Sequence, residues 1–248
     1  MSQKVVLVTG ALSGIGRATA LAFARAGDLV VIAGRREDAG AALLAELRAL
    51  GAEAEFVRTD VSKDDEIRTM VEAVVARFGR LDVAVNNAGT EGQLGPISEQ
   101  TSASYAATFD TNVLGTLLSM KHELRVMERQ AAGSIINLSS TFGHRGSANA
   151  ALYVASKHAV EGLTKSAALE GAAYNVRVNA VAPGPIDTEM LKRFTGSEER
   201  RAQFAAGVPL KRLGNVDEIA DVIVFLASES ARYLTGQIID VNGGKTAA

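Results

Sequence analysis

Short apolar runs alternate with longer amphipathic segments along all 248 residues, and this alternation restricts the possible fold most strongly. The runs are nearly continuous Val, Ile, Leu and Ala, as in the strands of a parallel sheet covered on both faces. The predicted strands are Val5–Val8, Leu29–Ala33, Ala54–Arg58, Val83–Val85, Ser134–Leu138, Arg177–Val181 and Gln237–Val241. The predicted helices are Gly16–Ala26, Ala39–Leu50, Asp64–Phe78, Ser102–Arg129, Leu152–Ala172 and Val216–Ala227.

This order of elements predicts an α/β fold in which a doubly wound, seven-stranded parallel sheet carries helices on both faces. The length suits one domain that spans residues 1–248, and no repeat, low-complexity tract or linker divides it. A loop-and-helix excursion from Pro183 to Val208 interrupts the alternation. We expect residues 185–208 to form a substrate loop, because insertions of this kind often cover a binding site.

The composition excludes several classes of partner. Lys plus Arg total 26 against 28 for Asp plus Glu, so no basic excess points to nucleic acid or to an anionic membrane. The absence of cysteine excludes disulfides and thiolate metal sites. The apolar run at Val5–Val8 is too short for a signal peptide or a membrane span. These features predict a soluble cytoplasmic protein.

A glycine-rich turn, Thr-Gly-Ala-Leu-Ser-Gly-Ile-Gly at residues 9–16, follows the first predicted strand and opens the first helix. In this context the first glycine allows a tight turn, the second a close approach of the backbone to a pyrophosphate, and the third close packing of helix on sheet. The helix N-terminus offers unpaired N–H groups to phosphate. The turn therefore predicts a dinucleotide site that includes Gly10, Ser13, Gly14, Ile15 and Gly16.

The end of the second strand bears on the choice of cofactor. A binder of NAD usually places a carboxylate there for the ribose hydroxyls, whereas this chain has Gly34 followed by Arg35 and Arg36. A guanidinium suits a phosphate group. NADP(H) is therefore favoured, with Arg35 as the main contact and Arg36 as a second, while NAD(H) stays possible. The alternative is that both arginines are solvated and Glu37 or Asp38 caps the next helix.

Tyr153 and Lys157 are four residues apart in a predicted helix, so they share one face and are separated by about 6 Å of rise. A tyrosine ionises near pH 10, and bringing its pKa towards neutrality takes about three units, or about 4 kcal/mol. A nearby cation in a partly dry cleft supplies energy of that order. We expect a tyrosine that exchanges protons near neutral pH.

Motifs along essentially the whole chain closely resemble the short-chain dehydrogenase/reductase family, in its compact single-domain branch with a Rossmann fold. They are Thr9-Gly10-(three residues)-Gly14-Ile15-Gly16, Asp60-Val61, Asn86-Asn87-Ala88-Gly89, Asn112, Ser139-Ser140, Tyr153-(three residues)-Lys157, Pro183-Gly184-Pro185-Ile186-Asp187-Thr188 and Val241-Asn242-Gly243-Gly244.

The resemblance implies a catalytic role for four residues. Tyr153 would be the general acid in carbonyl reduction and the general base in alcohol oxidation, and Lys157 would lower its pKa and hold the nicotinamide ribose. Ser140, thirteen residues before the tyrosine, would hydrogen-bond the substrate oxygen, with Ser139 as its rival. Asn112 would hold a water in a proton relay. No metal is implied.

The resemblance also implies further cofactor contacts. Asp60 and Val61 would lie beside the adenine. Asn86, Ala88 and Gly89 would line the cleft, although Asn87 is expected to tie neighbouring strands and the whole motif has a purely structural alternative. Ile186 and Thr188 would contact the nicotinamide carboxamide, on a turn shaped by Pro183 and Gly184.

Substrate selectivity is expected to come from the ends of the later strands and from the excursion. The expected substrate contacts are Ser140, Phe142, His144, Tyr153 and Met190. Further candidates for the lining are Glu91, Gln93, Leu94, Thr141, Ala150, Pro185, Leu191 and Phe194. Most are apolar and no arginine clamp for a carboxylate is evident, so a moderately hydrophobic ketone fits better than a sugar acid. His144 is expected at the rim.

The leading interpretation is an NADP(H)-dependent oxidoreductase that interconverts ketones and secondary alcohols. The alternatives are a 3-oxoacyl-thioester reductase, an NAD(P)-dependent sugar dehydrogenase and, from another class, a non-catalytic nucleotide-sensing protein. A homotetramer is expected from the resemblance, with a small-molecule substrate as partner. The physiological substrate, the favoured direction and the stereochemistry of the product do not follow from the sequence.

Overall fold

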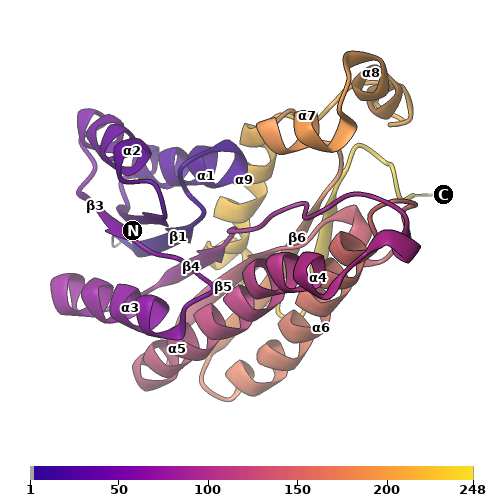
Figure 1. The fold of residues 1–248 in the computed structure, drawn as a ribbon. Coiled ribbons are helices and arrows are strands. Elements are labelled where there is room, and N and C mark those ends of the chain that lie inside the picture. Colours follow the sequence, from indigo (N-terminus) through magenta and orange to yellow (C-terminus); the bar gives the residue numbers. More distant parts are fainter. Residues whose placement is uncertain (1–2, 248) are drawn as a thin grey trace.

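Seven parallel strands form the central sheet of the computed structural model, which describes residues 3–247 (Figure 1). The strands are β1 Val5–Thr9, β2 Leu29–Gly34, β3 Ala54–Arg58, β4 Val83–Asn86, β5 Gly133–Leu138, β6 Val176–Pro183 and β7 Ile238–Val241. Their spatial order is β3-β2-β1-β4-β5-β6-β7. The chain order reverses between β1 and β4, and ligands of such sheets bind at the carboxyl ends of the strands near that point.

Helices cover both faces of the sheet (Figure 1). They are α1 Gly14–Arg25, α2 Glu37–Ala49, α3 Asp64–Phe78, α4 Ser102–Phe109, α5 Gly115–Gln130, α6 Ala151–Ala172, α7 Glu189–Thr195, α8 Glu198–Ala206 and α9 Val216–Leu226. One buried cluster joins the sheet to α1, α2 and α9, and a second joins its other face to α3, α5 and α6. Because both faces are covered, β1 is buried over its whole length, Val5–Thr9.

The predicted doubly wound parallel sheet is confirmed, and each predicted strand is present with shifts of at most a few residues at its ends. The predictions for Ala54–Arg58 and Asp64–Phe78 match the structure at both ends. The single helix predicted over Ser102–Arg129 is wrong in detail, because a π-helical turn at Asp110–Leu114 separates α4 from α5. Such turns often mark functional sites, and this one carries Asn112.

The excursion after β6 forms two short helices, α7 and α8, which lie apart from the sheet (Figure 1). The Thr188 hydroxyl accepts a hydrogen bond from the Leu191 N–H at the start of α7, and Ser197 caps α8 in the same way. These caps satisfy N–H groups that a short helix leaves free. Among residues 3–247, no helix combines the length and the apolar character that crossing a membrane requires.

Candidate active site

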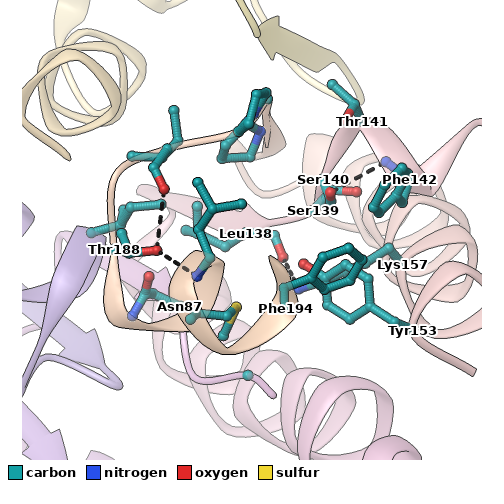
Figure 2. A pocket seen from close by; sticks show the side chains of 18 of the residues that line it. Asn87, Leu138, Ser139, Ser140, Thr141, Phe142, Tyr153, Lys157, Thr188 and Phe194 are labelled. Atoms are coloured by element: carbon teal, nitrogen blue, oxygen red, sulfur yellow. Dashed lines mark hydrogen bonds between the residues drawn. The ribbon is translucent and has the colours of Figure 1, made fainter. Parts of the chain in front are cut away.

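A cleft of about 150 Å³, open to solvent, brings residues from distant parts of the sequence together (Figure 2). It runs from Ile15 at the start of α1, past the ends of β5 and β6, to the excursion and the C-terminal segment. Its lining is Ile15, Asn87, Gly89, Thr90, Leu138, Ser139, Ser140, Thr141, Phe142, Tyr153, Lys157, Pro183, Gly184, Pro185, Ile186, Thr188, Met190, Leu191, Phe194, Phe204 and Lys245. Most of these side chains are apolar, which suits a hydrophobic ligand.

Tyr153 and Lys157 lie on the face of α6 that borders this cleft (Figure 2). The Lys157 side chain is buried, and its Nζ donates a hydrogen bond of 2.7 Å to the carbonyl oxygen of Leu138 at the end of β5. The same Nζ lies 5.7 Å from the centroid of the Tyr153 ring. The helix register therefore places an ammonium beside the phenol, as the spacing predicts.

The expected lowering of the tyrosine pKa is not found in this structure. Burial raises the pKa of Tyr153 to about 12, a hydrogen bond with Ser140 opposes the shift, and the charge of Glu91 adds to it. Burial also lowers the pKa of Lys157 to about 8. Loss of water from both groups outweighs their proximity, because the ammonium is directed at the Leu138 carbonyl rather than at the phenol oxygen.

Ser140 is held by the turn that follows β5. Its Oγ accepts a hydrogen bond of 3.2 Å from the N–H of Phe142 (Figure 2), and it lies near enough to the Tyr153 hydroxyl to lower the pKa of that phenol. The rival, Ser139, instead donates from Oγ to Glu161 Oε1 over 2.8 Å. The geometry thus distinguishes two adjacent serines: Ser140 belongs to the tyrosine, and Ser139 ties the strand end to α6.

Asn112 connects three elements from its position in the π-helical turn. Its Oδ1 accepts from the N–H of Thr90 over 2.8 Å, and its Nδ2 donates to the Thr90 carbonyl over 2.9 Å and to Ser156 Oγ over 3.0 Å. A Cβ at Gly89 would lie 3.4 Å from Asn112 Oδ1 and 3.7 Å from Lys157 Nζ. The glycine therefore leaves the space between the asparagine and the lysine open.

The glycine turn fits a bound phosphate. Gly10 and Gly14 have φ of +62° and +53°, which other residues rarely adopt, and a Cβ on Gly16 would collide with the Gly10 carbonyl. No side chain caps α1, and its first turn carries no acidic residue. Its N–H groups are therefore available to an anion. Ser13 stands at the N-cap position without bonding through its side chain.

The side chains of Arg35 and Arg36 are exposed beyond β2. Arg36 occupies the N-cap position of α2 without a side-chain bond, whereas Glu37 and Asp38 lie in the first turn rather than at the cap. Arg35 lies close enough to Asp60 to act on it electrostatically. Burial opposes the shift, but hydrogen bonds from Ser62 and the charge of Arg35 lower the pKa of Asp60.

Val61, the neighbour of Asp60, is buried against Gly115 of α5. Val61 borders a shallow surface hollow together with Thr9, Asn86 and Ala88. The predicted adenine contacts Asp60 and Val61 therefore both lie beyond β3, near Arg35, at one side of the switch point between β1 and β4.

Asn87 ties the end of β4 to β1, as expected, because its Nδ2 donates to the Thr9 carbonyl over 3.1 Å, whereas Asn86 does not line the main cleft. Asn86 is buried, and its Nδ2 donates to Glu123 Oε2 over 2.9 Å and to Asn137 Oδ1 over 3.0 Å, so it ties β4 to α5 and β5. Asn87 lines the cleft and also donates to the carbonyl of Gly10 over 2.9 Å. Successive residues at a strand end point to opposite faces, which accounts for the inward position of Asn86 beside a residue that faces the cleft. Ala88 packs against Gly10, since a Cβ on that glycine would lie 2.7 Å from the Ala88 Cα.

The expected substrate contacts Phe142 and Met190 line the cleft, whereas His144 does not. The imidazole of His144 lies between Glu161 Oε1, at 3.1 Å from Nδ1, and Asp240 Oδ1, at 3.3 Å from Nε2. The residues expected beside the nicotinamide, Pro183, Gly184, Ile186 and Thr188, all line the cleft. The Thr188 hydroxyl is engaged in capping α7 (Figure 2).

Several lining residues escaped the sequence analysis. Phe204 comes from α8 and Lys245 from the C-terminal segment, and the spacing of neither residue signals a cleft position. Leu138 contributes its backbone carbonyl, which any residue carries. These contacts depend on tertiary structure rather than on a local motif.

Comparisons with known proteins place the chain in a family. A family model described as enoyl-(acyl carrier protein) reductase matches residues 10–246. The chain is 42% identical over 246 residues to cis-4-hydroxycyclohexanecarboxylate dehydrogenase of Sinomonas cyclohexanicum, covering 99% of this chain and 98% of the relative. It is 43% identical over 245 residues to a 3-oxoacyl-[acyl-carrier-protein] reductase of Staphylococcus aureus (strain N315), with 97% of each covered.

Solved structures similar to this chain are oxidoreductases of the same kind. Levodione reductase superimposes with a TM-score of 0.96 at 35% identity, over 99% of this chain and 98% of that one. Actinorhodin polyketide ketoreductase with NADPH superimposes with a TM-score of 0.94 at 36% identity, over 99% of this chain and 98% of that one. NAD⁺-bound xylitol dehydrogenase superimposes with a TM-score of 0.93 at 34% identity, over 97% of this chain and 98% of that one. The chain belongs to the short-chain dehydrogenase/reductase family. It is an oxidoreductase that acts on hydroxyl or keto groups.

Proposed function

We propose that the protein is an NADP(H)-dependent carbonyl reductase or alcohol dehydrogenase for small to medium, moderately hydrophobic ketones and secondary alcohols. One observation carries the proposal. Tyr153, Ser140 and Lys157 line one largely apolar cleft, and the uncapped N-terminus of α1 borders the same cleft through Ile15. An acid, a hydrogen-bond donor, a cation and a phosphate site are the parts that hydride transfer to a carbonyl requires of the protein.

The dinucleotide, when bound, supplies or accepts the hydride. In reduction the Tyr153 hydroxyl donates its proton to the carbonyl oxygen of the substrate while Ser140 donates a hydrogen bond to the same oxygen. A pKa of about 12 keeps the phenol protonated at neutral pH, which suits the acid role. For oxidation the phenol has to lose its proton, and Lys157 is the cation nearest its ring that lines the cleft.

Asn112 acts here as a positioning residue. Its amide fixes the backbone of Thr90, which lines the cleft, against Ser156 on α6, the helix that carries the tyrosine and the lysine. Its Oδ1 and the ammonium of Lys157 face the same gap beside Gly89. A water in that gap would join the lysine to a proton relay, as the family resemblance implies.

The cofactor would bind along the edge of the sheet. The turn from Gly10 to Gly16 and the N–H groups of α1 would hold the pyrophosphate, and Arg35, with Arg36, would hold the 2′-phosphate. Asp60 and Val61 would border the adenine, and Lys157 the nicotinamide ribose. Neighbouring structures carry NADPH in one case and NAD⁺ in another, so the family accommodates both. The preference for NADP(H) rests on Arg35 and on the absence of a carboxylate at Gly34.

A 3-oxoacyl-thioester reductase is the second candidate, supported by the 43% identical relative. A carrier protein would need basic residues such as Lys121, Arg125 and Arg129 on α5. Lys121 is already paired with Asp64 over 2.7 Å, which weakens the docking surface. A sugar substrate is disfavoured by the aromatic lining at Phe142 and Phe194. A non-catalytic sensor would not need the complete set of catalytic groups.

Exposed apolar residues lie on the helices that cover one face of the sheet, and they support the expected homotetramer. They are Tyr105 on α4, Leu117 on α5 and Leu169 on α6, with Leu114 in the π-helical turn. A homo-oligomer would bury side chains of this kind against another subunit. Light scattering coupled to size exclusion gives the mass in solution and tests this point directly.

We also expect the excursion at residues 185–208 to cover bound substrate, since Met190, Leu191 and Phe194 already face the cleft.

The experiment measures steady-state turnover of NADPH and, separately, NADH with aryl ketones, a 3-oxoacyl thioester and a ketose. We expect a preference for NADPH with an aryl ketone. Tyr153→Phe should lower kcat by about 10²- to 10⁴-fold while leaving NADPH binding intact. Arg35→Leu should raise KM for NADPH about tenfold or more and leave KM for NADH nearly unchanged. Arg36→Leu serves as the matched variant, with a smaller effect.

Two results would overturn parts of the proposal. A preference for NADH would remove the assignment of Arg35 to the phosphate. Full turnover by Tyr153→Phe would show that Tyr153 is not the general acid or base. No turnover by the parent protein with any substrate would favour the non-catalytic sensor instead.

A further inference from the structure

A row of aromatic rings leads from the catalytic tyrosine to the outer end of the cleft. The ring centroid of Phe194 lies 6.4 Å from that of Tyr153 and 5.9 Å from that of Phe142. Phe204 continues the row at 6.0 Å from Phe194. All four rings line the cleft, so a ligand that reaches Tyr153 passes along an apolar wall.

Two cations stand beside this wall: Lys245 lines the cleft at Phe204, and Arg145 lies outside the lining at Phe142, whose ring centroid is 6.3 Å from that of Tyr153. The Nζ of Lys245 lies 5.7 Å from the centroid of Phe204, and the guanidinium carbon of Arg145 lies 5.8 Å from that of Phe142. Neither side chain has a carboxylate within 4.0 Å among residues 3–247. Burial, and secondly the charge of Arg145, lower the pKa of Lys245. A cation so placed is stabilised by an anion that enters the cleft.

The backbone of Lys245 is held in place. Its N–H donates to Asn242 Oδ1 over 2.9 Å, and Asn242 Nδ2 donates to Thr246 Oγ1 over 2.6 Å. Thr246 in turn donates to Asp240 Oδ2 over 3.1 Å, on β7. A Cβ on Gly184 would lie 2.7 Å from the Cα of Asn242, so the turn packs closely on the end of β6. The ammonium itself donates to the carbonyl of Gly207 over 3.4 Å.

We propose that Lys245, assisted by Arg145, forms a subsite for a carboxylate of the substrate, separated from the reacting carbon by an apolar spacer that lies along Phe194 and Phe204. The proposal rests on the proposed function and specifies its substrate class as keto or hydroxy acids with a hydrophobic body. On this proposal a lysine of the C-terminal segment would hold the carboxylate, where the sequence analysis found no arginine clamp. A carboxylate beside Lys245 would gain a charge-assisted hydrogen bond in a partly dry site, and the charge of Arg145, which already acts on Lys245, would add attraction.

The test compares acids with neutral amides of nearly the same shape. The probes are 4-acetylbenzoate and two longer ω-(4-acetylphenyl)alkanoates, each paired with its primary amide. The parent enzyme should show a lower KM for at least one acid than for its amide. Lys245→Met should reduce that acid-to-amide preference about tenfold or more, and Lys245→Arg should retain most of it. Lys165→Met, which removes an exposed lysine of α6, should leave it unchanged.

Gly207→Ala probes the geometry without changing the charge. Its new methyl group would lie 3.2 Å from Lys245 Nζ and displace the ammonium, whereas the backbone at this residue has an ordinary negative φ of −77°. It should reduce the acid preference in the same direction as Lys245→Met, with a smaller effect. Calorimetric titration of the acids and amides into the enzyme loaded with NADP⁺ measures the same preference independently of turnover.

Turnover of the amides with NADPH establishes the proposed function whatever happens to the acids. An acid preference that Lys245→Met leaves intact, or equal binding of acids and amides by the parent, would overturn the carboxylate subsite alone. A Lys245→Met effect confined to the 3-oxoacyl thioester would also overturn it, and would assign the lysine to thioester substrates.

Discussion

Glu123 offers the sharpest test of the physical reasoning, because it is a buried carboxyl that the proposed chemistry does not use. It lies on α5 under the sheet with no exposed surface, and its Oε2 accepts from Asn86 Nδ2 over 2.9 Å. Its Oε1 and the Oδ1 of Asn86 have no hydrogen-bond partner among residues 3–247. A proton on the carboxyl would allow it to donate to Asn86 Oδ1, which the ionised form cannot do.

Burial is the main cause that raises the pKa of Glu123 from 4.5 to about 7, against a hydrogen bond from Asn86 that lowers it. A shift of about 2.5 units corresponds to about 3 kcal/mol, at about 1.4 kcal/mol per unit. Between about pH 4.5 and pH 7 the unfolded chain has released this proton while the folded chain retains it. The stability contribution is therefore fully present below about pH 4.5 and is lost as the pH rises through about 7.

Glu123→Gln keeps the size of the side chain and cannot ionise. Its amide would donate to Asn86 Oδ1 and accept from Asn86 Nδ2, as the protonated carboxyl does. At about pH 5 the free energy of unfolding of this variant should exceed that of the parent by about 1 kcal/mol or less. At about pH 8.5 it should exceed it by about 3 kcal/mol.

Urea unfolding followed by circular dichroism at the two pH values gives both free energies. Glu170→Gln, at an exposed position on α6, controls for the loss of a carboxylate as such and should show no such dependence. A difference between Glu123→Gln and the parent that stays constant with pH, or a variant less stable at high pH, would refute the assignment of a neutral buried carboxyl.

Two further variants test the site. Lys157→Met should lower kcat/KM by about 10²-fold or more. It should nevertheless raise Tm at pH 7. The folded-state pKa of Lys157 is about 8, so the charged lysine lowers the stability of the fold below that pH, and this penalty fades as the pH rises towards 10.5. A fall in Tm would show that the hydrogen bond to the Leu138 carbonyl matters more than the cost of burying the charge. Gly34→Asp should destabilise the fold by about 1–3 kcal/mol, since a Cβ there would lie 2.7 Å from Leu12 Cδ1 and Cγ. Adding Leu12→Ala should recover most of this loss in the urea midpoint, and failure to do so would remove Leu12 as the cause.

The fold was predictable because the sheet is buried on both faces. Each strand then appears as a continuous apolar run, and the helices between strands have a different period. The ends of elements were less predictable, since caps and last turns depend on a few hydrogen bonds. The π-helical turn at Asp110–Leu114 illustrates the limit, because Asn112 bonds with Thr90 and Ser156, which lie 22 and 44 residues away.

The site was predictable where the chemistry is local. Tyr153 and Lys157 share a helix face, and the glycines of the turn are required by local backbone geometry. The inward position of Asn86 was not predicted, because its partners Glu123 and Asn137 lie 37 and 51 residues away. The contribution of Lys245 depends on the C-terminal turn packing onto β6, a contact of residues about 60 positions apart.

The choice between NADP(H) and NAD(H) depends partly on the local sequence and partly on tertiary packing. The sequence indicates that no carboxylate stands at Gly34, and it says nothing of the reason. In the structure, the space that a side chain at this position would enter is filled by Leu12 of the glycine turn. On the proposed function, the preference for NADP(H) is then encoded by a pair of residues, since an acid at position 34 needs a smaller residue at position 12. Gly34→Asp alone should therefore gain little turnover with NADH, while the double variant with Leu12→Ala should gain more, and equal gains would show that Arg35 decides the preference without Leu12.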